Sequence, residues 1–114
     1  MVDRWITVTF PDASVRAELS EDVARGLMGR TSLAEGQGML FDMRTNAIHR
    51  FWMKGVLMPL DIVFIYGGVI TGIIESAPAG DETGRFGSGR YVLEVAGGWC
   101  RKRGVRVGQR VEFS

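Results

Sequence analysis

The chain has 114 residues, of which 46% are hydrophobic and 24% are charged, and its formal net charge at pH 7 is +1. These values predict one globular domain over residues 1–114 and argue against a disordered chain. The balanced charge provides no basic field for a nucleic acid, and the longest apolar run, interrupted by Asp61, is too short to span a membrane.

The first part of the chain predicts a hairpin followed by a helix. Residues 5–10 and 15–19 have the β-branched, aromatic or alternating composition of strands, and a Pro-Asp turn separates them. Ser20 is a favourable N-cap with acidic residues after it, and apolar residues then recur at helical spacing up to Gly29. We therefore expect a short amphipathic helix at about 20–29, the only substantial helix of the chain.

The remainder of the chain predicts short strands joined by turns. Strands are expected at residues 39–41, 49–54, 61–66, 69–76, 91–95 and 105–113. Within the second of these, alternation places Arg50, Trp52 and Lys54 on one face. Residues 79–89 contain four glycines and predict the longest and most mobile loop, and residues 97–104 predict one short helical turn.

Together these elements predict a mainly β fold of about eight short strands with one short helix at about 20–29. Short strands at this spacing favour a single-domain antiparallel sandwich or a partly closed barrel. The sequence shows no alternation of strands with long helices, so it does not favour a parallel α/β sheet.

Common catalytic and metal-site motifs are missing from the sequence. A single histidine, His49, and a single cysteine, Cys100, do not supply a zinc site, and no nucleophile elbow or P-loop is present. The acids Asp42, Asp61 and Glu94 are too scattered to predict a site for a hard cation. We expect no metal and no cofactor.

Partners and compartment are only partly constrained by the sequence. The one basic cluster, at 101–103 with Arg106 and Arg110, lacks interleaved aromatic side chains, so it predicts a solvated turn and edge strand and no nucleic-acid partner. Residues 1–5 lack the apolar core of a signal peptide. A leader could nevertheless precede the chain, and the compartment and the oligomeric state stay open.

Six motifs, in order along the chain, carry a resemblance to a known family. They are Gly26-Leu27-Met28-Gly29-Arg30, Gly38-Met39-Leu40-Phe41, Phe51-Trp52-Met53-Lys54, Pro59-Leu60-Asp61-Ile62-Val63-Phe64, Val92-Leu93-Glu94-Val95-x-Gly97 and Gly104-Val105-x-Val107-Gly108. Over residues 15–112 this ordered set resembles the domain of unknown function 192 family. The resemblance implies a single compact β-rich domain and no particular activity, and many relatives look exported.

The chain departs from the family pattern at two places. Relatives tend to have Asn-Thr directly after the lysine of the Phe-Trp-Met-Lys motif, where this chain has Gly55-Val56. They also tend to have an aspartate near the last strand, where this chain has Gln109. If that asparagine is functional in relatives, the function is altered here.

The segment 50–65 is mostly apolar, yet it contains ionisable side chains that include Lys54 and Asp61. A functional hypothesis places a pocket at one end of the sheet, with Trp52 and Met39 as its floor, because ligand sites combine apolar walls with few polar groups. The residues predicted to bind the ligand are Arg30, Trp52, Lys54, Asp61 and Glu94.

Several functions are compatible with these residues. The preferred one is a binding module that holds a small molecule or a peptide at the Trp52/Lys54/Asp61 end. An alternative is an enzyme that uses Lys54 with Asp61 or Glu94 as an acid–base pair, and a weaker one is an interaction domain with an exposed sheet edge. A purely structural alternative makes Lys54 and Asp61 an ion pair that braces the turn at 55–60, with Trp52 in the core.

Overall fold

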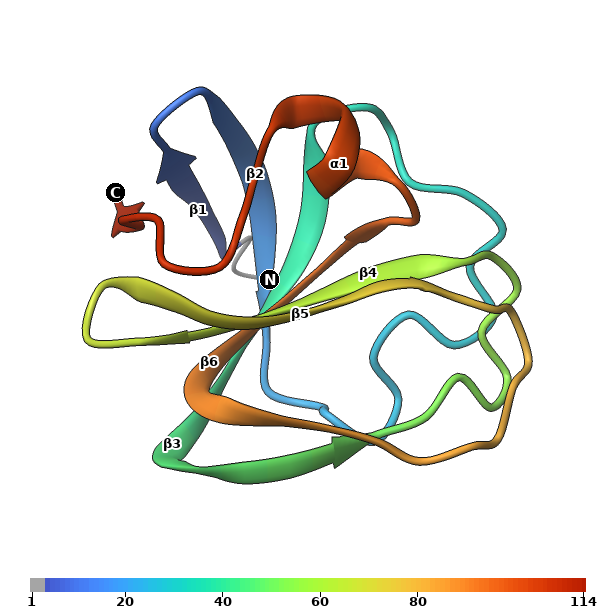
Figure 1. Ribbon diagram of the computed structural model, residues 1–114. Helices are drawn as coiled ribbons and strands as arrows, with labels where there is room; N and C mark the ends of the chain where they lie inside the picture. Colours follow the sequence, from blue (N-terminus) through green and yellow to red (C-terminus); the bar gives the residue numbers. More distant parts are fainter. Residues whose placement is uncertain (1–3) are drawn as a thin grey trace.

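The computed structural model describes residues 4–114 and shows a mainly β protein with one short helix (Figure 1). Its elements are β1 (Trp5–Phe10), β2 (Ala13–Ser20), β3 (Gln37–Phe51), β4 (Leu60–Tyr66), β5 (Val69–Ala77), β6 (Arg85–Ala96), α1 (Trp99–Arg103) and β7 (Glu112–Phe113). Residues 1–5, predicted to lack the apolar core of a signal peptide, lie partly outside the described residues.

The strands form one sheet that curls towards closure. The sheet has 7 strands in the order β5-β4-β6-β3-β2-β1-β7. Its edge strand β5 approaches the segment before β7, where the backbone N–H of Ile70 donates to the carbonyl of Gln109 at 3.0 Å and the N–H of Val111 donates to Gly68 at 2.9 Å. The predicted mainly β fold, with a partly closed barrel as one of its two forms, is therefore confirmed.

The sheet contains one parallel pair, which the sequence did not predict. Strands β2 and β3 run parallel, from Arg16 opposite Gln37 to Ser20 opposite Phe41, whereas the other pairs are antiparallel. Parallel neighbours need a long crossover connection. Residues 21–36 provide it, so this pair departs from the antiparallel pairing of the predicted sandwich, while the partly closed barrel remains compatible with the sheet.

The segment predicted to be a helix at about 20–29 belongs to this crossover and is not helical. Ser20 ends β2, and residues 23–29 form turns with isolated hydrogen bonds, such as that from the N–H of Gly26 to Asp22 at 2.9 Å. Gly26 and Gly29 adopt left-handed conformations, with φ of 47° and 79°, which interrupt a right-handed helix. The only helix among residues 4–114 is α1, within the helical turn predicted at 97–104.

Two long strands replace several of the short strands that were predicted. Strand β3 has 15 residues and continues through 42–47, which lies between the strands predicted at 39–41 and 49–54. A register shift against β6 between Asp42 and Ala47 marks an irregularity there, and such bulges bend a strand without ending it. Strand β6 begins at Arg85, so much of the predicted loop at 79–89 is also strand.

The interior has two groups of buried side chains. One surrounds α1 and includes Val8, Leu40, Val63, Leu93 and Trp99. We call the other the aromatic core; it includes Leu27, Met39, Phe41, Phe51, Met53 and Phe64. In the aromatic core the ring centroids of Phe41 and Phe51 lie 6.4 Å apart and those of Phe51 and Phe64 lie 5.9 Å apart, within the range of favourable aromatic pairs.

Candidate functional site

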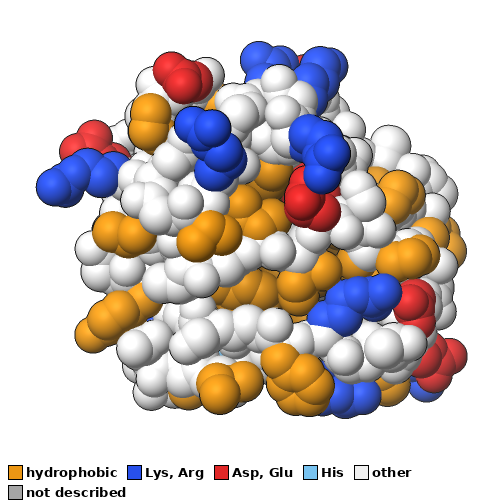
Figure 2. All heavy atoms as spheres, viewed as in Figure 1, with side chains coloured by type: hydrophobic (Ala, Val, Ile, Leu, Met, Phe, Trp, Pro, Cys, Tyr) orange, Lys and Arg blue, Asp and Glu red, His pale blue; other side chains and the backbone are white. Residues whose placement is uncertain are grey.

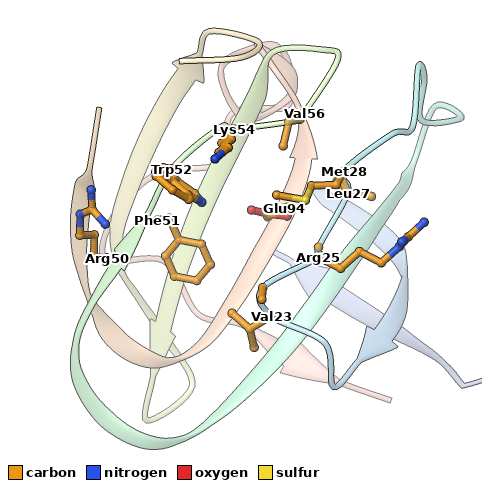
Figure 3. Close-up of a pocket in the computed structure, with 12 residues that line it drawn as sticks. Val23, Arg25, Leu27, Met28, Arg50, Phe51, Trp52, Lys54, Val56 and Glu94 are labelled. Atoms are coloured by element: carbon orange, nitrogen blue, oxygen red, sulfur yellow. The ribbon is translucent and has the colours of Figure 1, made fainter. Parts of the chain in front are cut away.

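A cavity of about 150 Å³ opens where the crossover turn meets the end of β3 (Figure 3). Its apolar walls include Leu27, Met28, Phe51 and Val56. Its polar and aromatic groups are Arg25, Arg50, Trp52, Lys54 and Glu94. The cavity borders the aromatic core, to which Leu27, Phe51 and Val56 belong.

Alternation at the end of β3 determines which side chains reach the rim of the cavity. Phe51 and Met53 are buried, whereas Arg50, Trp52 and Lys54 are exposed, as the sequence predicted. Cζ of Arg50 lies 5.5 Å and Nζ of Lys54 lies 5.3 Å from the Trp52 ring centroid, and Figure 3 shows Trp52 between the two cations. We call these three residues the cationic rim, which cation–π attraction helps to hold in place.

Glu94 places a buried carboxyl group in the same cavity. It lies in β6 and is only 6% exposed. Among residues 4–114, no hydrogen bond or ion pair engages the carboxyl group, and burial alone raises the pKa of Glu94 from 4.5 to about 7. Figure 3 shows this carboxyl group between Trp52 and Met28. A carboxyl group with a perturbed pKa in a cleft is a typical feature of functional sites.

Asp61 does not belong to the cavity. Its side chain is fully buried, and its Oδ1 atom accepts hydrogen bonds from the backbone N–H groups of Ser76 at 2.8 Å and Gly98 at 3.0 Å. Its Oδ2 atom accepts another from Cys100 at 2.9 Å. No ion pair joins Lys54 to Asp61 in the described part of the chain, so the structure contains neither the predicted brace nor a site shared by the two residues.

Two other residues of the predicted pocket lie outside this cavity. Arg30 pairs with Glu18, with its Nη2 atom 3.1 Å from Oε1. Met39, predicted as part of the floor, is 3% exposed within the aromatic core. The structure therefore brings together Trp52, Lys54 and Glu94 of the predicted set.

The contribution of the crossover turn to the cavity was not predicted from the sequence. Residues 23–28 line one side of the cavity, and Arg50 contributes from β3. The Gly26-to-Arg30 motif, two of whose glycines adopt positive φ, was the available indication that this segment is an irregular turn. Its helical spacing of apolar residues favoured a helix instead.

A second hollow lies beside α1. It has a volume of about 460 Å³ and is lined by residues of β5 and of the 100–107 segment, including Ile73, Glu75, Arg101 and Val105. Figure 2 shows hydrophobic side chains exposed across the middle of the face in view, with charged side chains around them. None of the predicted site residues lines this hollow.

Part of the basic cluster at the end of the chain, residues 101–103, is paired with acids. Arg101 lies 3.2 Å from Glu75, and Glu35 lies 3.2 Å from Lys102 and 3.3 Å from Arg103. These ion pairs reduce the positive charge that a polyanion would meet. The structure of residues 4–114 also contains no group of three or more side chains that could hold a metal ion.

No helix of the described chain is long and apolar enough to cross a membrane.

Comparisons with known proteins identify a family and similar structures. The model of the domain of unknown function 192 family, described as an "uncharacterized ACR", matches residues 7–113. A crystal structure of a protein of unknown function from Novosphingobium aromaticivorans is similar, with a TM-score of 0.86 and 34% identity over 95% of this chain and 83% of that one. A proposed transcription regulator from Sinorhizobium meliloti has a TM-score of 0.89 and 30% identity, covering 98% of this chain and 94% of that one. No curated protein matches the chain.

Proposed function

The chain belongs to the domain of unknown function 192 family, and we propose that it is a binding module for a small ligand. Membership of this family indicates no particular activity. The ligand would occupy the cavity between the crossover turn and the end of β3. Glu94 and the cationic rim would provide its polar contacts. This replaces the site first expected at the Trp52/Lys54/Asp61 end, because Asp61 is engaged by backbone N–H groups.

The state of Glu94 is the observation that carries this proposal. Burying an ionisable group without a partner is unfavourable for folding, and Glu94 is held in the cavity without one among residues 4–114. A hydrogen-bonding ligand would supply the missing partner. Groups whose burial is unfavourable for folding commonly serve function.

The size of the cavity limits the part of the ligand that enters it. Sites for drug-sized molecules are usually about 300–1,000 Å³, whereas this cavity has about 150 Å³. A cavity of roughly that volume holds a benzene molecule. The buried part of the ligand would therefore be one small molecule, or one side chain of a peptide.

Nucleic-acid binding receives less support. The Sinorhizobium meliloti protein is described as a proposed transcription regulator, but residues 101–103 of the basic cluster of this chain are paired with Glu35 and Glu75. A net charge of +1 adds no strong attraction for a polyanion. The cavity provides more specific chemistry than this surface.

The test is a fragment screen by two-dimensional NMR on protein labelled with nitrogen-15. Bound fragments should shift the amide signals of residues 23–28 and 50–56. Ala24→Trp fills the cavity from an exposed lining position and should abolish these shifts, whereas Ala34→Trp, the same change at an exposed position away from the cavity, should preserve them. A screen that shifts no residue of the cavity would refute the proposed function.

A second candidate function is acid–base catalysis by Glu94 with Lys54. The specific observation is that the pKa of Glu94 is about 7, where a carboxyl group can both accept and donate protons near neutral pH. Asp61, the other carboxylate considered from the sequence, is fully buried and does not line the cavity. Bound fragments should then be followed for chemical conversion, and catalysis by Glu94 requires that Glu94→Gln binds them without converting them.

A further inference from the structure

The distribution of charge in the cavity narrows the chemical class of its ligand. We infer that the ligand is a small zwitterion, in which a short apolar chain separates an ammonium group that meets Glu94 from an acid group that meets the cationic rim. This inference rests on the proposed function and specifies the occupant of the same cavity.

The buried carboxyl group of Glu94 favours an ammonium group as its partner. Glu94 is 6% exposed and has no partner among residues 4–114. An ammonium group offers both hydrogen bonds and the opposite charge, and charge-assisted hydrogen bonds are roughly twice as strong as neutral ones. A second anion at this position would instead be repelled and desolvated.

The cations of the cavity favour an acid group on the ligand. Arg25, Arg50 and Lys54 line it, and none of them forms an ion pair within residues 4–114. Most other basic side chains, such as Arg90 with Asp42, have acidic partners, although Arg16, Arg106 and Arg110 form no ion pair within these residues. Arg50 and Lys54 lie against Trp52, which is 40% exposed. An acid group at this rim would meet cations that have no other counterion.

The surfaces between these charges are apolar. Leu27, Phe51 and Val56 line the cavity and belong to the aromatic core. Methylene groups of a ligand would pack against them, which is favourable because apolar surface is removed from water. The apolar walls therefore suit a linker between the charges better than a compact, fully hydrated ion.

A series of amino acids of increasing chain length tests the inference, because each additional methylene group increases the distance between the ammonium group and the carboxylate. The probes are glycine, β-alanine, γ-aminobutyrate, δ-aminovalerate and ε-aminocaproate. Each is compared with the amine and the carboxylic acid of the same chain length. Binding is measured by NMR titration of the amide signals of residues 23–28 and 50–56.

We expect an optimum length whose zwitterion binds about tenfold or more tightly than either singly charged analogue, since close charge pairs in a desolvated site contribute at least that much. Glu94→Gln should weaken the zwitterion about tenfold while changing the carboxylic acid little. Lys54→Met should weaken the zwitterion and the carboxylic acid but not the amine. Lys102→Met, which removes a lysine paired with Glu35 away from the cavity, is the matched control.

The outcomes separate this inference from the proposed function. If an amine, an acid or an uncharged fragment shifts the amide signals of the cavity residues as strongly as every zwitterion does, the zwitterion inference is wrong. The proposed binding module then stands. Equal affinity of the zwitterions for wild type and Glu94→Gln would also overturn the inference. If neither the series nor a chemically broad fragment set shifts these residues, both are refuted.

Discussion

The backbone N–H of Cys100 donates a hydrogen bond of 2.9 Å to Oδ2 of Asp61, a residue in the distant strand β4. Oδ1 of the same carboxylate accepts from Gly98 and Ser76. Gly98 is the N-cap of α1, so Asp61 satisfies backbone donors at the start of that helix. One buried side chain thereby ties β4 to α1 and to β5.

Asp61→Asn should destabilise the protein by about 2–4 kcal/mol, because the amide lacks the negative charge and replaces one acceptor with a donor that faces backbone N–H groups. Urea unfolding followed by tryptophan fluorescence measures the loss. Asp12→Asn, at an exposed residue of the first turn, is the matched control and should change stability by less than about 0.5 kcal/mol. Equal stability of the two variants would contradict the assigned role of Asp61.

Lys54→Met and Asp61→Asn should act independently of each other. Lys54 lies against Trp52, whereas Asp61 bonds to backbone N–H groups, so a double-mutant cycle in urea should give a coupling energy below about 0.5 kcal/mol. Lys54 is exposed, and its single change should leave the unfolding free energy nearly unaltered. A coupling energy of about 2 kcal/mol or more would contradict this prediction and would indicate the ion pair that the sequence suggested.

Glu94 should make the protein less stable as pH rises from about 4.5 to about 7. Its folded-state pKa is about 7 and its ordinary value is 4.5, so in this range the native state holds a proton that the unfolded state has lost. Stability therefore falls with increasing pH. Because one pKa unit corresponds to about 1.4 kcal/mol, the full loss above this window is on the order of 3 kcal/mol.

The measurement is the urea unfolding free energy of wild type and Glu94→Gln across this pH range. Other groups titrate in both proteins, so the difference between the two curves isolates Glu94. The variant should gain stability relative to wild type as pH rises. Parallel curves would show that Glu94 ionises normally in the folded protein.

Gly87→Ala should destabilise the protein by about 1–3 kcal/mol, since a Cβ atom there would overlap the ring of Phe64 in the aromatic core. Gly72→Ala is a matched control, because its Cβ would lie 3.8 Å from the same ring, in ordinary contact. This second variant should be as stable as wild type or slightly more stable, as its unfolded chain has less freedom. Thermal unfolding measures the melting temperature of each variant. Equal melting temperatures of Gly87→Ala and Gly72→Ala would argue against close packing at Gly87.

Cys100 should react with an aromatic disulfide reagent only when local or global unfolding exposes its thiol. It is 1% exposed, and burial, followed by the charge of Asp61, raises the pKa of its thiol above the ordinary value. Its thiolate fraction in the native state is therefore low. Labelling should be slow in buffer, complete in urea and faster in Asp61→Asn, and rapid labelling of native wild type would disprove this.

Part of the candidate site could be predicted because it depends on local periodicity. Alternation alone separates exposed Arg50, Trp52 and Lys54 from buried Phe51 and Met53, whatever the rest of the chain does. The same rule predicted most strands and the mainly β class. It failed at 20–29, where apolar spacing suggested a helix but two left-handed glycines make an irregular turn.

The amino-acid sequence by itself determined the strand composition, the faces of the strands and the family resemblance. Only the tertiary structure decided that Glu94 meets the crossover turn without a partner in the described part of the chain, while Asp61 accepts from three backbone donors, those of Ser76, Gly98 and Cys100. Both are acids in apolar strands, and nothing local distinguishes them. The strand order and the parallel β2–β3 pair bring different distant backbone segments to each carboxyl group, and a side chain's charge state depends on those non-local neighbours.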